Sequence, residues 1–264
     1  MTRRVVPRGA ADPADDGWAG LRQWTAARIG LARSGASLAT APLLDFRLAH
    51  AQARDAVHES LDVARLLVDL AAIGLPGCAV ASAAADRRSY LMRPDLGRRL
   101  APEAAATLAP LAGDPELGLA IVIADGLSAR AVQAHAVPVL AEALPTLQAD
   151  GWRLAAPVVV RQGRVAVGDA VAAALGARAV ALLIGERPGL SAPDSLGMYL
   201  TWQPGPATTD AERNCISNVR LAGVPYRDAA FKLAYLLRAM RRRRLSGVAL
   251  KDDSDRLLIG EEPA

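Results

Sequence analysis

The chain has few of the residue types that build disulfide frameworks, zinc sites and histidine-based active sites. Its 264 residues include two cysteines and three histidines. Cys78 and Cys215 lack a Cys-x-x-Cys spacing and a matching histidine cluster, so they predict neither a zinc site nor a disulfide framework. His50, His58 and His135 are scattered among segments with helical patterns, and no Gly-x-Ser-x-Gly, His-Glu-x-x-His or P-loop motif occurs. The sequence therefore predicts no metal site and no classical catalytic set.

Long hydrophobic runs and a dinucleotide-binding motif are absent as well. No two glycines stand two positions apart, which excludes the Gly-x-Gly-x-x-Gly fingerprint of nicotinamide cofactor sites. No apolar run approaches the roughly 20 residues that a membrane helix needs. The basic start of the chain lacks the apolar segment of a secretory signal. A cytoplasmic location is therefore expected.

Aromatic residues make up only 4% of the chain, although hydrophobic residues make up 52%. The apolar residues are mostly Ala, Leu and Val, which predicts a core of small aliphatic side chains. A chain of this length can form one large domain or two modest domains with a buried core.

Charge is nearly balanced, because 31 basic residues face 27 acidic ones, for a formal net charge of +4. One dense basic run, residues 241–244, leaves nucleic-acid binding open as a hypothesis. We favour a solvated helix end, because cations complement the negative end of the helix dipole. In that interpretation Gly247 supplies the C-terminal cap of the helix.

The patterns divide the chain into three parts. Residues 1–20 carry Pro, Gly and Asp with little apolar periodicity, which predicts a mobile tail. Residues 21–76 contain an irregular arm at 25–42, which needs a surface to lie against, and predicted helices at 43–57 and 61–73. Residues 77–264 alternate short apolar runs with helical segments, which predicts an α/β domain with a mostly parallel, Rossmann-like sheet flanked by helices.

Expected strands and helices of the α/β domain follow from these runs. Strands are predicted at residues 78–82, 119–124, 156–160, 179–184 and 198–202, with an edge strand at 247–250. Helices are predicted at residues 95–108, 128–147, 168–175 and 226–243. Pro138 and Pro145 are expected to kink or end the second of these helices.

Polar residues gather where predicted strands end, the edge at which open α/β sheets bind ligands. Asp125 and Ser128 follow the strand at 119–124, where they either face a ligand together with backbone N–H groups or only cap the turn. Residues 209–212 match a capping box and predict a short helical turn that presents Arg213, Asn214 and Cys215.

Several long and irregular sequence segments resemble those of a known family. They include Gly185-Glu-Arg-Pro-Gly-Leu190, Asp194-Ser-Leu-Gly197, Asp210-Ala-Glu-Arg-Asn-Cys-Ile-Ser-Asn218, Tyr90-Leu-Met-Arg-Pro-Asp-Leu-Gly97 and Ala27-Arg-Ile-Gly-Leu-Ala-Arg-Ser-Gly-Ala-Ser37. In these words and their order, most of the chain resembles the small subunit, or light chain, of ethanolamine ammonia-lyase.

The resemblance implies a subunit of a cobalamin enzyme. The family uses adenosylcobalamin to convert ethanolamine into acetaldehyde and ammonia by a radical mechanism. It implies that ethanolamine binds mainly to a TIM-barrel large subunit, that cobalamin lies between the two chains, and that the heterodimer is repeated in a larger oligomer. The small subunit is then inactive alone. The cobalt keeps its own base as lower ligand, in agreement with the absence of an Asp-x-His-x-x-Gly motif.

The family's cobalamin contacts match Val165, Glu186 and Cys215 of this sequence. A carboxylate such as Glu186 can accept hydrogen bonds from corrin amides or ribose hydroxyls. Val165 and Cys215 can pack against the ligand or offer backbone groups. Without the resemblance, Glu186 would be interpreted as a surface carboxylate paired with Arg187, and Cys215 as a simply buried residue.

Two other questions remain open at this stage. A stand-alone, non-catalytic cobalamin-binding module is the main alternative function. Relatives in this family can be packaged into bacterial microcompartments, although residues 1–20 do not form a clear amphipathic targeting helix.

Overall fold

The computed structural model describes residues 18–31, 33–112 and 118–255. The predicted mobile tail, residues 1–20, lies outside the described residues except for its last three positions. Among the residues described, no helix is long and apolar enough to cross a membrane.

A six-stranded mixed sheet forms the centre of the molecule, with the strand order β3-β5-β4-β6-β7-β8. The first four strands in this order are parallel to one another, and β7 pairs antiparallel with both of its neighbours, β6 and β8. The strands are β3 (Cys78–Ala81), β4 (Leu119–Ala124), β5 (Val158–Arg161), β6 (Ala179–Gly185), β7 (Leu196–Trp202) and β8 (Arg213–Val219). The predicted α/β class and mostly parallel sheet are confirmed.

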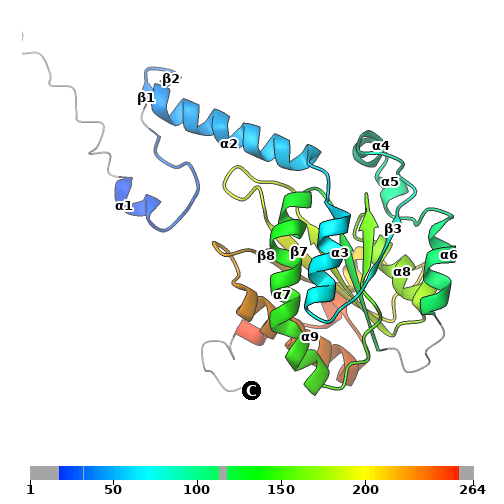
Figure 1. The fold of residues 1–264 in the computed structure, drawn as a ribbon. Coiled ribbons are helices and arrows are strands. Elements are labelled where there is room, and N and C mark those ends of the chain that lie inside the picture. The colour runs from blue at the N-terminus through cyan, green and yellow to red at the C-terminus, as the bar shows by residue number, and fades with distance from the viewer. Residues whose placement is uncertain (1–17, 32, 113–117, 256–264) are drawn as a thin grey trace, which may run out of the picture.

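Helices cover both faces of this sheet (Figure 1). One face packs against α3 (Val63–Ala72), α7 (Ala129–Ala149) and α9 (Tyr226–Arg243). The other packs against α6 (Ala104–Leu108), the 3-10 turn η1 (Ala109–Leu111) and α8 (Val167–Leu175). Every residue of β4 and β6 is buried, and such continuous apolar strands are typical of a sheet covered on both sides.

The predicted helix at 95–108 is wrong in its extent. The structure has α4 (Arg87–Met92) and α5 (Pro94–Gly97), then an extended stretch before α6. In that stretch Leu100 bridges to Ser82, and the Ala101 N–H donates to Ala81 O at 3.0 Å. The chain leaves the helix there because it pairs with the end of β3.

Three further expectations concern α7 and the residues after α9. Pro138 and Pro145 lie inside α7 and do not end it, because tertiary burial of the helix offsets the lost hydrogen bonds, and the expected kink stays a prediction. Residues 247–250 form no edge strand, since Gly247–Ala249 is the 3-10 turn η3. Gly247 is not the cap of α9 either, because Arg244 takes the left-handed conformation there, with φ 54°.

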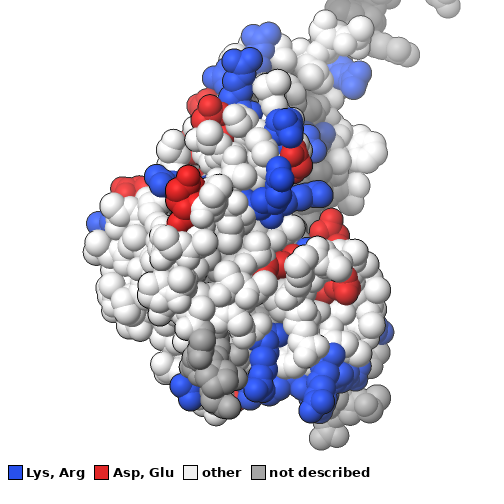
Figure 2. Space-filling model, turned by 90° about the vertical axis from the view of Figure 1, so that its right-hand side faces the viewer, with Lys and Arg blue, Asp and Glu red and all other residues white. Residues whose placement is uncertain are grey.

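Two arginines near the end of α9 make contacts within the molecule. Arg238 Nε lies 2.6 Å from Asp150 Oδ2, and Arg241 stacks on the Trp152 ring at 3.7 Å. Figure 2 shows acidic and basic side chains interspersed over the upper half of the face it presents, with basic ones at its lower edge. Residues 241–244 are all exposed, which agrees with the interpretation of this run as a solvated helix end.

The N-terminal part extends away from the sheet. It consists of α1 (Ala19–Arg22), a small hairpin of β1 (Arg33–Ser34) and β2 (Ser37–Leu38), and the long helix α2 (Thr40–His58). Figure 1 shows the hairpin at the outer end of α2. Only Ala49 and Ala56 of α2 are buried. The expected irregular arm therefore contains a hairpin and the first turn of α2.

A close backbone contact at the end of β6 fixes the turn that follows β4, at the carboxyl ends of the parallel strands. A Cβ atom at Gly185 would lie 2.0 Å from Ser128 O and 2.6 Å from Asp125 O. The Leu127 N–H donates to Gly185 O at 2.9 Å. The turn after β4 is thereby held directly against the end of β6.

We expect Gly185→Ala to destabilise the fold by about 3 kcal/mol, because a backbone atom cannot move aside as a side chain can. Urea-induced unfolding of the purified chain measures this change. Gly189→Ala is the matched control, since a Cβ there would approach Ala192 O no closer than 3.8 Å. Equal stabilities of the two variants would contradict the close contact.

Candidate functional site

Two adjoining cavities open at the carboxyl ends of β4, β5 and β6. The first, of about 420 Å³, is lined by segments that follow these three strands and by α4 and β7. The second, of about 400 Å³, extends toward β8. Arg164, Val165 and Tyr199 line both cavities, which therefore adjoin and are together called the recess. This is the edge at which open α/β sheets bind ligands.

The structure brings the three predicted site residues together around this recess. Val165 and Glu186 line the first cavity, and Val165 and Cys215 line the second. They come from three separate segments: the loop before α8, the end of β6, and β8. Their assignment as cobalamin contacts remains a prediction.

Glu186 is held by hydrogen bonds within the chain. Its carboxylate accepts from the Ser195 hydroxyl, from Ser217 Oγ at 2.5 Å and from the Asn218 N–H at 3.2 Å. The expected alternative pairing with Arg187 is not what the structure shows for this carboxylate. Because a carboxylate has about four acceptor positions, most of its capacity is already used. Glu186 therefore fixes the loops around the recess and has little capacity left for a ligand.

Asp125 fixes the loop that carries Val165. Its carboxylate is 4% exposed and accepts from the N–H groups of Gln162 at 2.9 Å and Gly163 at 3.1 Å. Burial raises the pKa of this carboxyl, and the backbone donors partly oppose the rise. Ser128 accepts from the Ala131 N–H as the cap of α7. The structure thus confirms the capping interpretation for Ser128, whereas Asp125 holds the neighbouring loop at residues 162–163.

Cys215 lies on β8, opposite Tyr199 of β7. The predicted capping box at Thr209 and Glu212 is confirmed, but it forms only the 3-10 turn η2 (Asp210–Glu212). The predicted short helical turn is therefore present as η2, and the residues that it leads into, 213–215, begin β8. Cys215 is exposed, so simple burial does not describe it. Part of the thiol is nevertheless covered, and this burial raises its pKa.

Tyr90 and two arginines were not anticipated from the sequence. The Tyr90 ring, 1% exposed, has Arg87 at 4.6 Å and Arg164 at 4.2 Å from its centre. Burial raises the pKa of Tyr90 to about 12, which keeps its hydroxyl neutral. Within the described structure, Arg164 Nε is buried without a hydrogen-bond partner. The sequence signal that could have identified Arg164 is its position directly before Val165.

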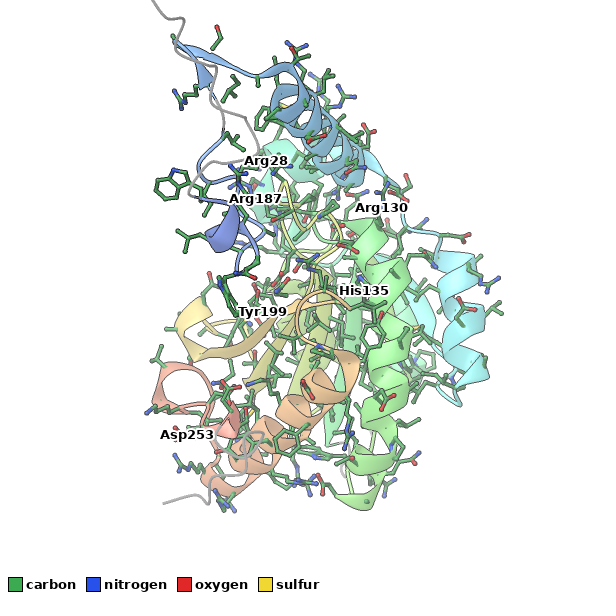
Figure 3. The ribbon with its side chains drawn as sticks, turned by 90° about the vertical axis from the view of Figure 1, so that its left-hand side faces the viewer. Arg28, Arg130, His135, Arg187, Tyr199 and Asp253 are labelled. Carbon is green, nitrogen blue, oxygen red and sulfur yellow. The ribbon has the colours of Figure 1, made fainter. Side chains whose placement is uncertain are left out.

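The recess suits recognition of a polar ligand rather than acid–base chemistry. Among the described residues, no group of three His, Cys, Asp or Glu side chains could hold a metal ion. Glu186 and Asp125 are committed to loop donors, whereas Arg164 and Arg187 reach the cavity wall. In Figure 3 Arg187 lies above Tyr199, beneath the N-terminal segment that carries Arg28. Guanidinium groups at such a wall can donate to amide or phosphate oxygens.

Cys215 should react slowly with iodoacetamide, because a raised pKa leaves less thiolate at neutral pH. The reaction rate should rise with pH only above the pH at which the rate of a free cysteine rises. The Cys78→Ala variant isolates this thiol, and Cys215→Ser gives the background. A rate–pH curve matching a free cysteine would contradict the raised pKa.

Comparisons with known proteins identify the family of the chain. The model of the family described as ethanolamine ammonia-lyase light chain matches residues 15–251. The ethanolamine ammonia-lyase small subunit of Bradyrhizobium diazoefficiens is 58% identical over 235 residues, covering 89% of this chain and 90% of that protein. The small subunit of Xanthomonas campestris pv. campestris is 54% identical over 256 residues, covering 96% and 93%. The chain therefore belongs to the ethanolamine ammonia-lyase light chain family.

Proposed function

We propose that this chain is the small subunit of an adenosylcobalamin-dependent ethanolamine ammonia-lyase and helps to hold the cofactor in its base-on form. The observation that carries the proposal is the convergence of Val165, Glu186 and Cys215 on one recess. These positions are far apart in sequence and match the family's cobalamin contacts. A chance surface arrangement would not bring all three to the ligand-binding edge of the sheet.

The residues around the recess fit a ligand rich in amides. Cobalamin carries amide side chains that both donate and accept hydrogen bonds. The buried Arg164 Nε has no partner among the described residues and would find one in an amide oxygen. Val165 and the aromatic face of Tyr199 supply apolar contact beside it. Glu186 would act mainly by keeping the surrounding loops in place.

Chemistry would be divided between two subunits. Adenosylcobalamin, when bound, would supply the radical that starts the conversion of ethanolamine into acetaldehyde and ammonia. The present chain would bind and orient one side of the cofactor and exclude water from it. The large subunit would bind ethanolamine, so the carbon–nitrogen lyase activity would need both chains. This division agrees with the lack of an acid–base set in the recess.

Acetaldehyde release from ethanolamine tests the function directly. The chain, the matching large subunit and adenosylcobalamin are supplied singly, in pairs and together, and activity is expected only when all three are present. Cobalamin binding by the isolated chain as tightly as by the complex would instead favour the stand-alone binding module. No activity from a folded, cofactor-loaded complex would sink the proposed reaction.

The N-terminal part is the surface we assign to the large subunit. Trp24 is 81% exposed, and Leu44 and Leu48, one helical turn apart on α2, are 56% and 60% exposed. Such clustered exposed apolar side chains mark interaction sites in proteins. The helix also projects from the sheet, so a partner can reach this face without disturbing the core (Figure 1).

The double variant Leu44→Gln, Leu48→Gln should bind the large subunit about a hundredfold more weakly, because each leucine buried at an interface contributes about 1.5 kcal/mol or more. Affinity copurification and a titration measure the loss. Val248→Gln, which changes an 87% exposed side chain in η3, is the control. Wild-type association of the α2 variant would exclude α2 from the interface.

A further inference from the structure

The word Asp194-Ser-Leu-Gly197 closes the loop that carries Glu186 and Arg187. This loop, residues 186–195, runs from the end of β6 to the start of β7. Its two ends meet, since the Glu186 N–H donates to Ser195 O at 2.9 Å. A Cβ at Gly197 would lie 2.8 Å from Glu186 Oε1, so the glycine leaves space for that carboxylate. The loop therefore leaves the sheet and returns to it at one place, and its conformation depends on the contacts that its residues make with the rest of the protein.

Asp194 connects the C-terminal end of the loop to α7 and to the segment after β8. Its Oδ2 lies 3.4 Å from His135 Nε2 of α7, and its Oδ1 lies 3.8 Å from Arg220 NH1 after β8. The side chains of His135 and Arg220 are 6% and 15% exposed, so both partners are fixed by the body of the protein. Figure 3 shows His135 on α7, in the interior of the molecule.

His135 is oriented toward Asp194 by a second contact. Its Nδ1 lies 2.8 Å from the Tyr226 hydroxyl at the start of α9. When Nδ1 accepts from that hydroxyl, Nε2 carries the proton, and Asp194 Oδ2 lies 3.4 Å from this nitrogen. Nε2 makes no hydrogen bond among the described residues, so the negative charge of Asp194 is its principal compensation.

Arg220 connects the loop to the segment after β8. Besides the Asp194 contact, its NH1 donates to Ser191 O at 3.3 Å and its Nε donates to Asn218 Oδ1 at 2.9 Å. Asn218 in turn donates its N–H to Glu186. Both ends of the loop are thus tied to residues 217–220, through two separate carboxylates.

We propose that Asp194 is a positioning residue that, through His135 and Arg220, holds loop 186–195 in the conformation that keeps Glu186 and Arg187 at the recess. The proposal rests on the proposed function for its effect on cofactor binding. The Asp194 side chain is 35% exposed and is not part of the apolar core, so its loss should release the loop and leave the sheet intact.

The test uses the complete complex of small and large subunits with Asp194→Ala, Asp194→Asn and a matched control. Asp150→Ala removes the same charge from the Arg238 ion pair near the end of α7, remote from the recess. Hydrogen exchange of residues 186–195 is measured first, without cofactor. Activity is then measured against adenosylcobalamin concentration, which separates half-saturation from the maximal rate.

For Asp194→Ala we expect loop exchange and the half-saturating cofactor concentration each to rise about tenfold, with little change in maximal rate, because the negative charge facing His135 and Arg220 is lost. Asp194→Asn keeps the size of the side chain but removes its charge, so it should raise both quantities to a similar extent if the charge of Asp194 holds His135 and Arg220. Asp150→Ala should change neither quantity.

Three results would overturn the proposal. Unchanged exchange of the loop would show that Asp194 does not hold it. Faster exchange that extends through α7 and the sheet would show a general structural role. Faster loop exchange with unchanged half-saturation would show that the loop does not serve the cofactor. If the wild-type complex needs no adenosylcobalamin, the proposed function fails, and the exchange result still decides whether Asp194 holds the loop.

Discussion

The close backbone contact between the end of β6 and the turn after β4 determines the geometry of the whole recess. Gly185 allows Ser128 O and Asp125 O to approach to distances that any side chain would prevent. The turn that begins α7 is therefore fixed against β6, and Asp125 of that turn fixes the loop carrying Val165. One contact between neighbouring parallel strands thereby sets the relative positions of three loops.

Carboxylates around the recess stabilise loops more than they face a ligand. Asp125 accepts from two backbone N–H groups, and Glu186 accepts from two hydroxyls and one N–H. The groups with free hydrogen-bonding capacity are basic, above all Arg164. Because the carboxylates are satisfied before a ligand arrives, the loops need little reordering on binding. The recess is in this sense preorganised.

Local patterns predicted the parallel part of the fold and failed where tertiary pairing decides. The continuous apolar runs of β4 and β6 and the core stripe of α9 were found because burial on both faces requires them. The strand β8 was missed because its alternating Ser, Asn and Arg become a strand only beside β7. The words around Val165, Glu186 and Cys215 located the recess, whereas the saturation of Glu186 depends on Ser217, 31 positions away.

The projecting N-terminal part should make the abundance of this chain depend on the abundance of the large subunit. Trp24 and the leucines of α2 expose apolar surface that an unassembled copy cannot bury within itself. Chaperones and proteases recognise such surface. A surplus of this chain over its partner would therefore be removed, and balanced synthesis of the two subunits would be needed to maintain its abundance. On the proposal that α2 binds the large subunit, its exposed leucines would mark a chain that has not been assembled.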